Sequence, residues 1–136
     1  MLTFRLYVLF LLLINPTSVL KSRESATPQG SHAISASGNV FADFCKHLDD
    51  VENLRYVSEN GVCIGWVQGF TQGVTVTDEF LQIPKEKRMM CPPDEVTFGQ
   101  YSRIIYKYIS DHPERAHMAT RYLASEALMR AFPCSK

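Results

Sequence analysis

The sequence has no excess of charge of either sign. Its 136 residues include 14 lysines and arginines and 14 aspartates and glutamates, so the formal net charge at neutral pH is zero. A protein that binds a nucleic acid is expected to carry a basic excess or a basic stripe, and this sequence has neither. The composition therefore argues against a polyanionic partner, and no nucleic acid is expected.

Sequence motifs of the common enzyme and metal sites are also absent. The chain has no glycine-rich phosphate loop, no Gly-x-Ser-x-Gly elbow and no His-Glu-x-x-His motif. His112 and His117 are five residues apart, which is the wrong spacing for two metal ligands on one helical face. We therefore expect no catalytic residue, no metal and no cofactor, and we interpret the chain as a binding protein rather than an enzyme.

The N-terminal apolar run is too short to cross a membrane. It extends from Leu6 to Ile14 and is interrupted by Asn15 and Pro16. A spanning helix needs about 20 apolar residues, whereas the apolar core of a signal peptide is about half that length. Residues 1–20 are therefore predicted to be a signal peptide for export to the periplasm, with no stable membrane span. An uncleaved membrane-proximal anchor is the alternative.

The chain after the apolar run divides into a linker and one small domain. Residues 21–38 are rich in serine and other small polar residues and have no apolar period, so they are predicted to be a flexible linker. The folded domain is expected to comprise residues 39–136. A domain of this size has a limited hydrophobic core, and covalent cross-links would compensate for it.

Apolar residues of the domain recur with a helical period, which predicts an all-α fold, a small disulfide-stapled bundle of about four helices. The first helix is expected from Val40 to Val51, with Asn39 as its N-cap. Residues 54–60 are polar and are predicted to be irregular, and Gly61 precedes the second helix. The apolar face of this second helix comprises Cys63, Trp66, Val67 and Phe70.

The third and fourth helices have recognisable start signals. Thr97 and Gln100 form the predicted capping box of the third helix, which ends near Ser110. Pro113 is predicted to open the fourth helix at its first turn, where the missing N–H does no harm. Pro133 ends this helix. Because the turn between the two helices is short, they should run antiparallel.

Four cysteines in an exported domain indicate two disulfides rather than reactive thiols. Antiparallel third and fourth helices would bring Cys134 beside Cys91. This leaves Cys45 to pair with Cys63, which joins the first two helices. The sequence therefore favours this pairing among the three that four cysteines allow.

Four glycines recur at every fourth residue of the second helix, namely Gly61, Gly65, Gly69 and Gly73. Each glycine inside a helix costs about 1 kcal/mol relative to alanine. A stripe of them is most simply explained by another part of the same chain that packs very close. A functional groove or a dimer face is the alternative explanation.

Several short motifs follow one another in order along the domain, and four of them contain the cysteines. They are Gly38-Asn39, Phe44-Cys45, Cys63-Ile64-Gly65-Trp66, Gly69, Cys91-Pro92, Val96-Thr97-Phe98-Gly99-Gln100, Tyr108, His112-Pro113-Glu114 and Ala131-Phe132-Pro133-Cys134. In this order they resemble the Rap/Tai family of type VI secretion immunity proteins. Trp66 stands where the family usually has tyrosine. The resemblance implies a structural role for the residues of these motifs, among them Trp66, Gln100 and Pro113.

The resemblance implies an all-helical periplasmic protein that binds and blocks a peptidoglycan amidase delivered by another cell. Members of the family often form dimers, so a homodimer is a further expectation. The alternative is a periplasmic helical binding or chaperone-like module without a toxin partner.

Contacts with the toxin are expected in the long connector from Thr75 to Pro93, because the segment from Thr75 to Met90 matches no family motif. Tight inhibition usually depends on a few buried aromatic or arginine anchors. Phe80, Arg88 and Met89 are therefore the candidate partner-binding residues.

Overall fold

The computed structural model describes residues 33–50 and 52–134, and this part of the chain contains helices and no strands. The predicted all-α fold with four helices is therefore confirmed. The predicted signal peptide and most of the predicted linker lie outside the described residues. The helices are α3 (Gly38–Cys45), α4 (Leu54–Phe80), α5 (Phe98–Asp111) and α6 (Thr120–Ala131), with short 3-10 turns at η3 (Lys85–Lys87) and η4 (Pro113–Arg115).

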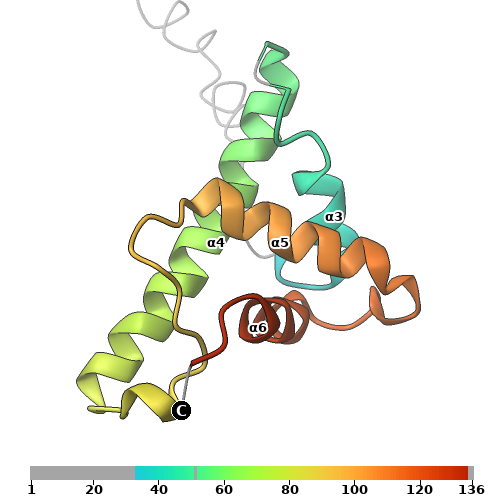
Figure 1. Ribbon diagram of the computed structural model, residues 1–136. Helices are drawn as coiled ribbons and strands as arrows, with labels where there is room; N and C mark the ends of the chain where they lie inside the picture. The colour runs from blue at the N-terminus through green and yellow to red at the C-terminus, as the bar shows by residue number, and fades with distance from the viewer. Residues whose placement is uncertain (1–32, 51, 135–136) are drawn as a thin grey trace, which may run out of the picture.

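Helix α5 lies at the centre of the bundle. It packs against α3, α4, α6 and the turn η4. Figure 1 shows α4 along one side of the molecule, with α5 crossing it and α6 beyond α5. The largest fully buried side chains come from all four helices and from the segment before α3: Phe41, Ile34, Ile105, Leu123, Leu128, Val67, Thr120, Cys45, Cys63 and Ser102.

The domain begins before the predicted boundary at residue 39. Ile34, inside the predicted linker, is fully buried, and its carbonyl accepts a hydrogen bond from the Thr120 Oγ1 at 2.6 Å. Ser37, not Asn39, is the N-cap of α3, and its hydroxyl accepts from the Val40 N–H. This helix ends at Cys45 rather than at Val51, because residues 46–49 form turns.

Helix α4 is longer at both ends than the sequence indicated. It includes the stretch 54–60 that was predicted to be irregular, because Asn60 occupies a buried position on the same face as Cys63 and Val67. The Asn60 Nδ2 donates to the His47 carbonyl at 2.7 Å, which satisfies the donor side of this buried amide, whereas its Oδ1 has no hydrogen-bond partner among the described residues. The apolar period of the sequence does not predict this part of the helix, because the buried face continues through Asn60, a polar residue.

The first residues of the predicted connector belong to the C-terminal end of α4. Gln82 has a φ of 51°, in the left-handed region. The Ile83 N–H donates to the Asp78 carbonyl at 2.8 Å, and the Gln82 N–H donates to the Glu79 carbonyl at 3.1 Å. These two bonds form a Schellman motif, which ends the helix without a glycine. The connector between α4 and α5 is therefore residues 81–97.

The predicted disulfide pairing is the pairing in the structure. Cys45 bonds to Cys63 with a Cα–Cα distance of 5.5 Å, and Cys91 bonds to Cys134 with a Cα–Cα distance of 5.0 Å. The first bridge is buried between α3 and α4. The second is partly exposed and joins the connector to the residues after α6, where the Cys91 N–H also donates to the Phe132 carbonyl.

The starts of α5 and α6 differ in how closely they follow the prediction. The capping box of α5 is present, with Thr97 and Gln100 each accepting from the backbone of the other. Pro113 opens the 3-10 turn η4 instead of α6, which begins only at Thr120. The predicted fourth helix is thus divided into a tight turn and a shorter helix.

The tight packing predicted for the glycine stripe of α4 is wrong. At Gly61, Gly65, Gly69 and Gly73, a Cβ atom would meet none of the described atoms outside its own helix within 4 Å. Close packing instead occurs at Gly38, where a Cβ would lie 2.5 Å from the Leu123 side chain and 3.1 Å from the Ala116 carbonyl.

We predict opposite effects of alanine at these two kinds of glycine. Gly38→Ala should lower the free energy of unfolding by about 2 kcal/mol, because α3 must move away from α6. Gly61→Ala should raise it by up to about 1 kcal/mol, because the new methyl group enters open space and reduces the entropy of the unfolded chain. Urea denaturation of both variants measures the difference. Equal effects would contradict the packing described for α3.

Candidate partner-binding surface

The described residues offer no evident centre for catalysis or metal binding. Within residues 33–50 and 52–134, no group of three or more histidine, cysteine, aspartate or glutamate side chains could hold a metal ion. All four cysteines are bonded in disulfides. The same part of the chain has no helix that is both long and apolar enough to cross a membrane. A candidate site must therefore be sought on the surface.

Exposed apolar side chains gather at the C-terminal end of α4. Val76, Phe80 and Leu81 are 62%, 83% and 59% exposed, and they lie within six residues of one another. We call these three residues the apolar cluster. Helix α4 extends beyond α5 at this end (Figure 1), so the apolar cluster lies on a projecting part of the molecule. Grouped apolar side chains on a soluble domain are typical of protein-binding sites.

A cleft of about 440 Å³ lies beside the apolar cluster. Thr75, Asp78 and Glu79 of α4 form one wall, and the connector forms the other. The connector contributes side chains of both charges as well as apolar ones: Lys85, Arg88, Met90, Cys91, Pro92 and Asp94. An apolar anchor next to a charged cleft could bind a protein loop that carries both kinds of side chain.

The structure places two of the three predicted contact residues at this end of the molecule. Phe80 belongs to the apolar cluster, and Arg88 lines the cleft. The Arg88 Nε donates to the Ile83 carbonyl at 3.2 Å, which restrains an otherwise exposed side chain. Met89 is half-buried and packs against the core, so it is a poor candidate for a direct contact.

The connector is held in place along its length. The Schellman motif fixes its start, and the 3-10 turn η3 is closed by the Lys87 N–H, which donates to the Pro84 carbonyl. Met90 is buried, and Cys91 is bonded to Cys134. A surface that is ordered before binding loses less conformational entropy when a partner binds.

Trp66 is partly buried and packs against other aromatic side chains at the core. Its ring packs edge-on against Phe41 at 5.6 Å and stacks on Phe70 at 5.3 Å between ring centroids. Gln100 caps α5 and Pro113 opens η4, so all three residues of the sequence motif have structural roles.

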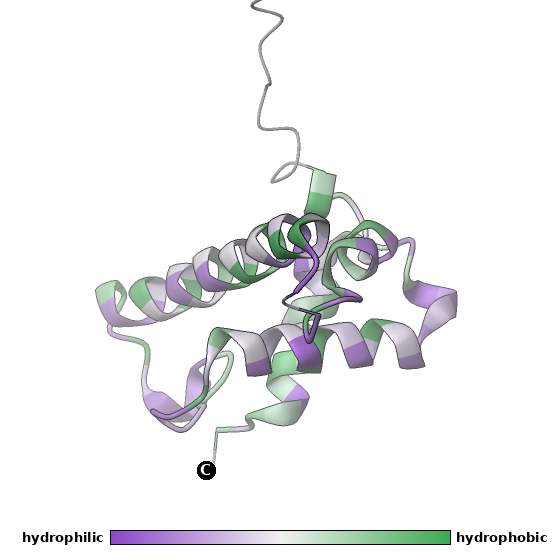
Figure 2. Ribbon diagram, turned by 90° about the horizontal axis from the view of Figure 1, so that it is seen from above, coloured by the Kyte–Doolittle hydropathy of each residue, from purple (hydrophilic) through white to green (hydrophobic). Residues whose placement is uncertain are grey.

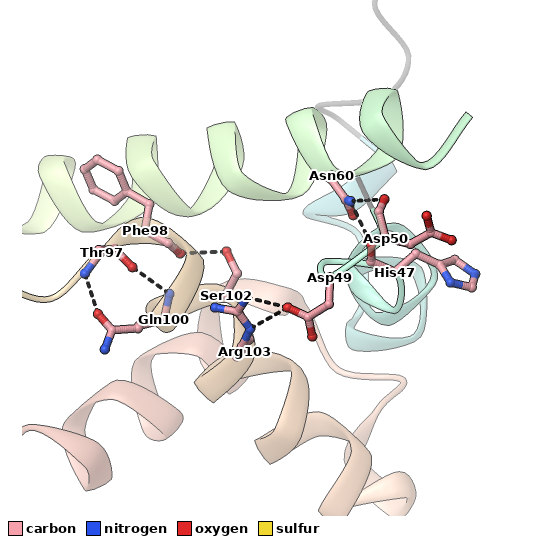
Figure 3. A network of polar contacts seen from close by, with 9 residues as sticks. All are labelled: His47, Asp49, Asp50, Asn60, Thr97, Phe98, Gln100, Ser102 and Arg103. Atoms are coloured by element: carbon pink, nitrogen blue, oxygen red, sulfur yellow. Dashed lines mark hydrogen bonds and ion pairs between the residues drawn. The ribbon is translucent and has the colours of Figure 1, made fainter. Parts of the chain in front are cut away.

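Polar contacts fix the position of α4 against the rest of the fold (Figure 3). The Asn60 amide holds the turn after α3, and Arg103 of α5 pairs with Asp49 of the same turn. The Arg103–Asp49 pair is exposed and contributes little stability by itself. Its position nevertheless links α5 to the junction between α3 and α4.

A second polar network joins η4 and α6 to α5. The Nη1 and Nη2 of Arg115 each donate to the Glu126 carboxylate, and the Tyr108 hydroxyl donates to the same carboxylate at 2.5 Å. The hydrogen bonds from Arg115 and then Tyr108 lower the pKa of Glu126 from 4.5 to about 2, although partial burial acts in the opposite direction. The same ion pair raises the pKa of Arg115 above its usual range.

Sequence reasoning missed Val76, Leu81 and the acidic wall of the cleft. It placed the end of the second helix before Thr75, because no glycine or proline marks the true end at Phe80. The absence of any helix breaker between Val74 and Ile83 is the signal that could have extended the helix.

The fold is that of a small all-helical domain cross-linked by two disulfides. The family model of the Rap1a immunity proteins matches residues 37–134, and the chain belongs to this family. Nothing matches this chain among the curated proteins or among the solved structures. Membership indicates a role in immunity to a type VI effector, and it implies a cognate toxin as the partner.

The Glu126 network predicts a specific loss of stability in acid. Because its pKa in the folded protein lies below the ordinary value of 4.5, Glu126 stabilises the fold above about pH 4.5 and loses this contribution as the pH falls towards about 2. Glu126→Gln should therefore flatten the pH dependence of the unfolding free energy in this interval. The exposed Glu86→Gln serves as the control. An unchanged slope in Glu126→Gln would show that the network does not stabilise the fold.

Proposed function

We propose that this protein is a periplasmic immunity protein that blocks a type VI secreted peptidoglycan amidase by covering its active site. The family assignment supports the toxin partner. Two disulfides support a compartment that is more oxidising than the cytoplasm, and the predicted signal peptide supports export. The apolar cluster beside the charged cleft is the observation that carries the proposal, because it provides a preformed surface for a protein partner.

Occlusion is the mechanism that this surface favours. The end of α4 projects from the bundle and presents Phe80, while Arg88 lies on the opposite side of the cleft from Glu79. An aromatic ring and an arginine are the residue types that most often dominate the energy of an interface. Inserted at the mouth of a substrate groove, they would exclude the peptidoglycan stem peptide without any chemical step.

Toxin rescue tests the function as a whole. Candidate amidases would be directed to the periplasm of a host cell with and without this protein, and lysis would be followed by turbidity. Rescue from one amidase, with a stable one-to-one association of the two proteins in vitro, is expected. A protein that rescues from none of the amidases and binds many unfolded clients weakly would be a chaperone-like module instead.

The contact residues are tested by a double substitution. Phe80→Ala with Arg88→Ala should weaken inhibition of the amidase at least about a hundredfold, because two anchors of the interface are lost. The fold should be unaffected, since both side chains are exposed. Inhibition of peptidoglycan hydrolysis by the purified variant provides the measurement.

The matched control is Tyr122→Ala with Arg121→Ala. These residues form an exposed aromatic and arginine pair on α6, with the guanidinium 4.6 Å from the ring centroid. The control should inhibit as well as the wild type. A folded Phe80/Arg88 variant that still inhibits fully would place the toxin contact elsewhere on the molecule.

A further inference from the structure

Two cationic residues of the cleft lie directly against the Cys91–Cys134 disulfide. The Cys91 sulfur is 3.6 Å from the Lys85 carbonyl oxygen, and the Cys134 sulfur is 3.6 Å from the Arg88 carbonyl oxygen. A disulfide sulfur carries no hydrogen, so these are packing contacts and not hydrogen bonds. Because Lys85, Arg88 and Cys91 all line the cleft, the bridge is part of the cleft wall.

Residues 85–88 have exposed side chains and lie at the edge of the molecule, where Figure 2 shows a hydrophilic part of the connector. The Arg88 N–H donates to the Lys85 carbonyl, and the Arg88 Nε donates to the Ile83 carbonyl, each at 3.2 Å. These bonds shape the turn but do not attach it to the core. The disulfide attaches it to the residues after α6, where Phe132 packs against the core.

The two disulfides differ in how far a reductant can reach them. Cys45 and Cys63 are 1% and 0% exposed and belong to the hydrophobic core. Cys91 and Cys134 are partly exposed and lie outside the core cluster of the described residues. Reduction requires a thiolate to reach a sulfur atom of the disulfide, so access favours reduction of the second bridge.

We propose that the Cys91–Cys134 disulfide positions the connector wall of the toxin-binding cleft, and that its reduction by a dithiol weakens toxin binding while the helical core stays folded. Met90 is buried in the core, so the connector remains attached there when the bridge is open. Residues 85–88 lose their fixed position, and ordering them again when the toxin binds costs conformational entropy. The effect on the toxin rests on the proposed function, whereas the positioning of the connector does not.

The reduction is a thiol–disulfide exchange. A thiolate of the dithiol attacks one sulfur of the bridge, which forms a mixed disulfide and releases the other cysteine. The second thiol of the reductant then attacks the mixed disulfide, closes its own disulfide and releases the remaining cysteine. Two electrons pass from the dithiol to the bridge, and the two cysteines take up the two protons that the dithiol loses. Exchange with a protein disulfide reverses these steps.

A series of dithiothreitol concentrations tests the order of reduction in the free protein. Free thiols would be alkylated and located by mass spectrometry, and Cys91 and Cys134 should be labelled before Cys45 and Cys63. At short labelling times, hydrogen–deuterium exchange of the selectively reduced protein should rise in residues 81–94, and its helical circular dichroism should be retained. Simultaneous reduction of both bridges, or unchanged exchange in residues 81–94, would overturn the proposal.

Cross-links of different length separate the positioning of the cleft wall from the stability of the whole domain. A disulfide also restricts the unfolded chain, so its loss alone lowers stability. After selective reduction, Cys91 and Cys134 would be joined either by a methylene group, with diiodomethane, or by a bis-maleimide with a long flexible spacer. Both products keep the loop closed in the unfolded chain, but only the methylene link keeps the two residues close together.

Inhibition of the amidase that the rescue assay identifies is then compared between the two products, without reductant so that the amidase is not altered. The methylene-linked protein should inhibit as well as the oxidised protein, whereas the long link should raise the Kd at least about tenfold. Equal inhibition by both folded products would overturn the proposal and leave the proposed function intact. If the oxidised protein inhibits no amidase, the proposed function fails, and the exchange measurement still decides whether the bridge positions the connector.

Discussion

The disulfide between Cys45 and Cys63 is the constraint on which the rest of the fold depends. Helix α3 has only eight residues, too few to be stable alone, and the bridge holds its last residue against the N-terminal part of α4. Closing this loop stabilises the domain by about 3 kcal/mol in the loop-entropy model. Once α3 and α4 are joined, their inner faces form the surface on which α5 packs.

This arrangement explains why the C-terminal end of α4 is exposed. The bridge fixes the helix near its N-terminal third, so its C-terminal turns extend past α5 and present Phe80. The second bridge, from Cys91 to Cys134, ties the returning connector to the end of the chain. The long helix and the returning connector therefore hold the two walls of the cleft.

The sequence predicted the parts of the fold that local chemistry determines. The capping box at Thr97 and the two disulfides follow from residue types and spacing, and the structure contains both. The extent of α4 could not be read from the pattern, because Asn60 is polar yet buried through its bond to the His47 carbonyl. Phe80 was predicted to be a contact residue and is exposed at the end of α4. The cleft could not be predicted, because it depends on how the connector folds back over α4.

Hydrogen–deuterium exchange of the protein, free and bound to its cognate toxin, tests most directly whether the end of α4 and the connector form the toxin-binding surface. We predict that residues 76–94 gain the strongest protection on binding, because the toxin covers the apolar cluster and the cleft. Helix α6 should exchange at the same rate in both states. Protection centred on α6, with residues 76–94 unchanged, would show that the toxin does not bind at the end of α4.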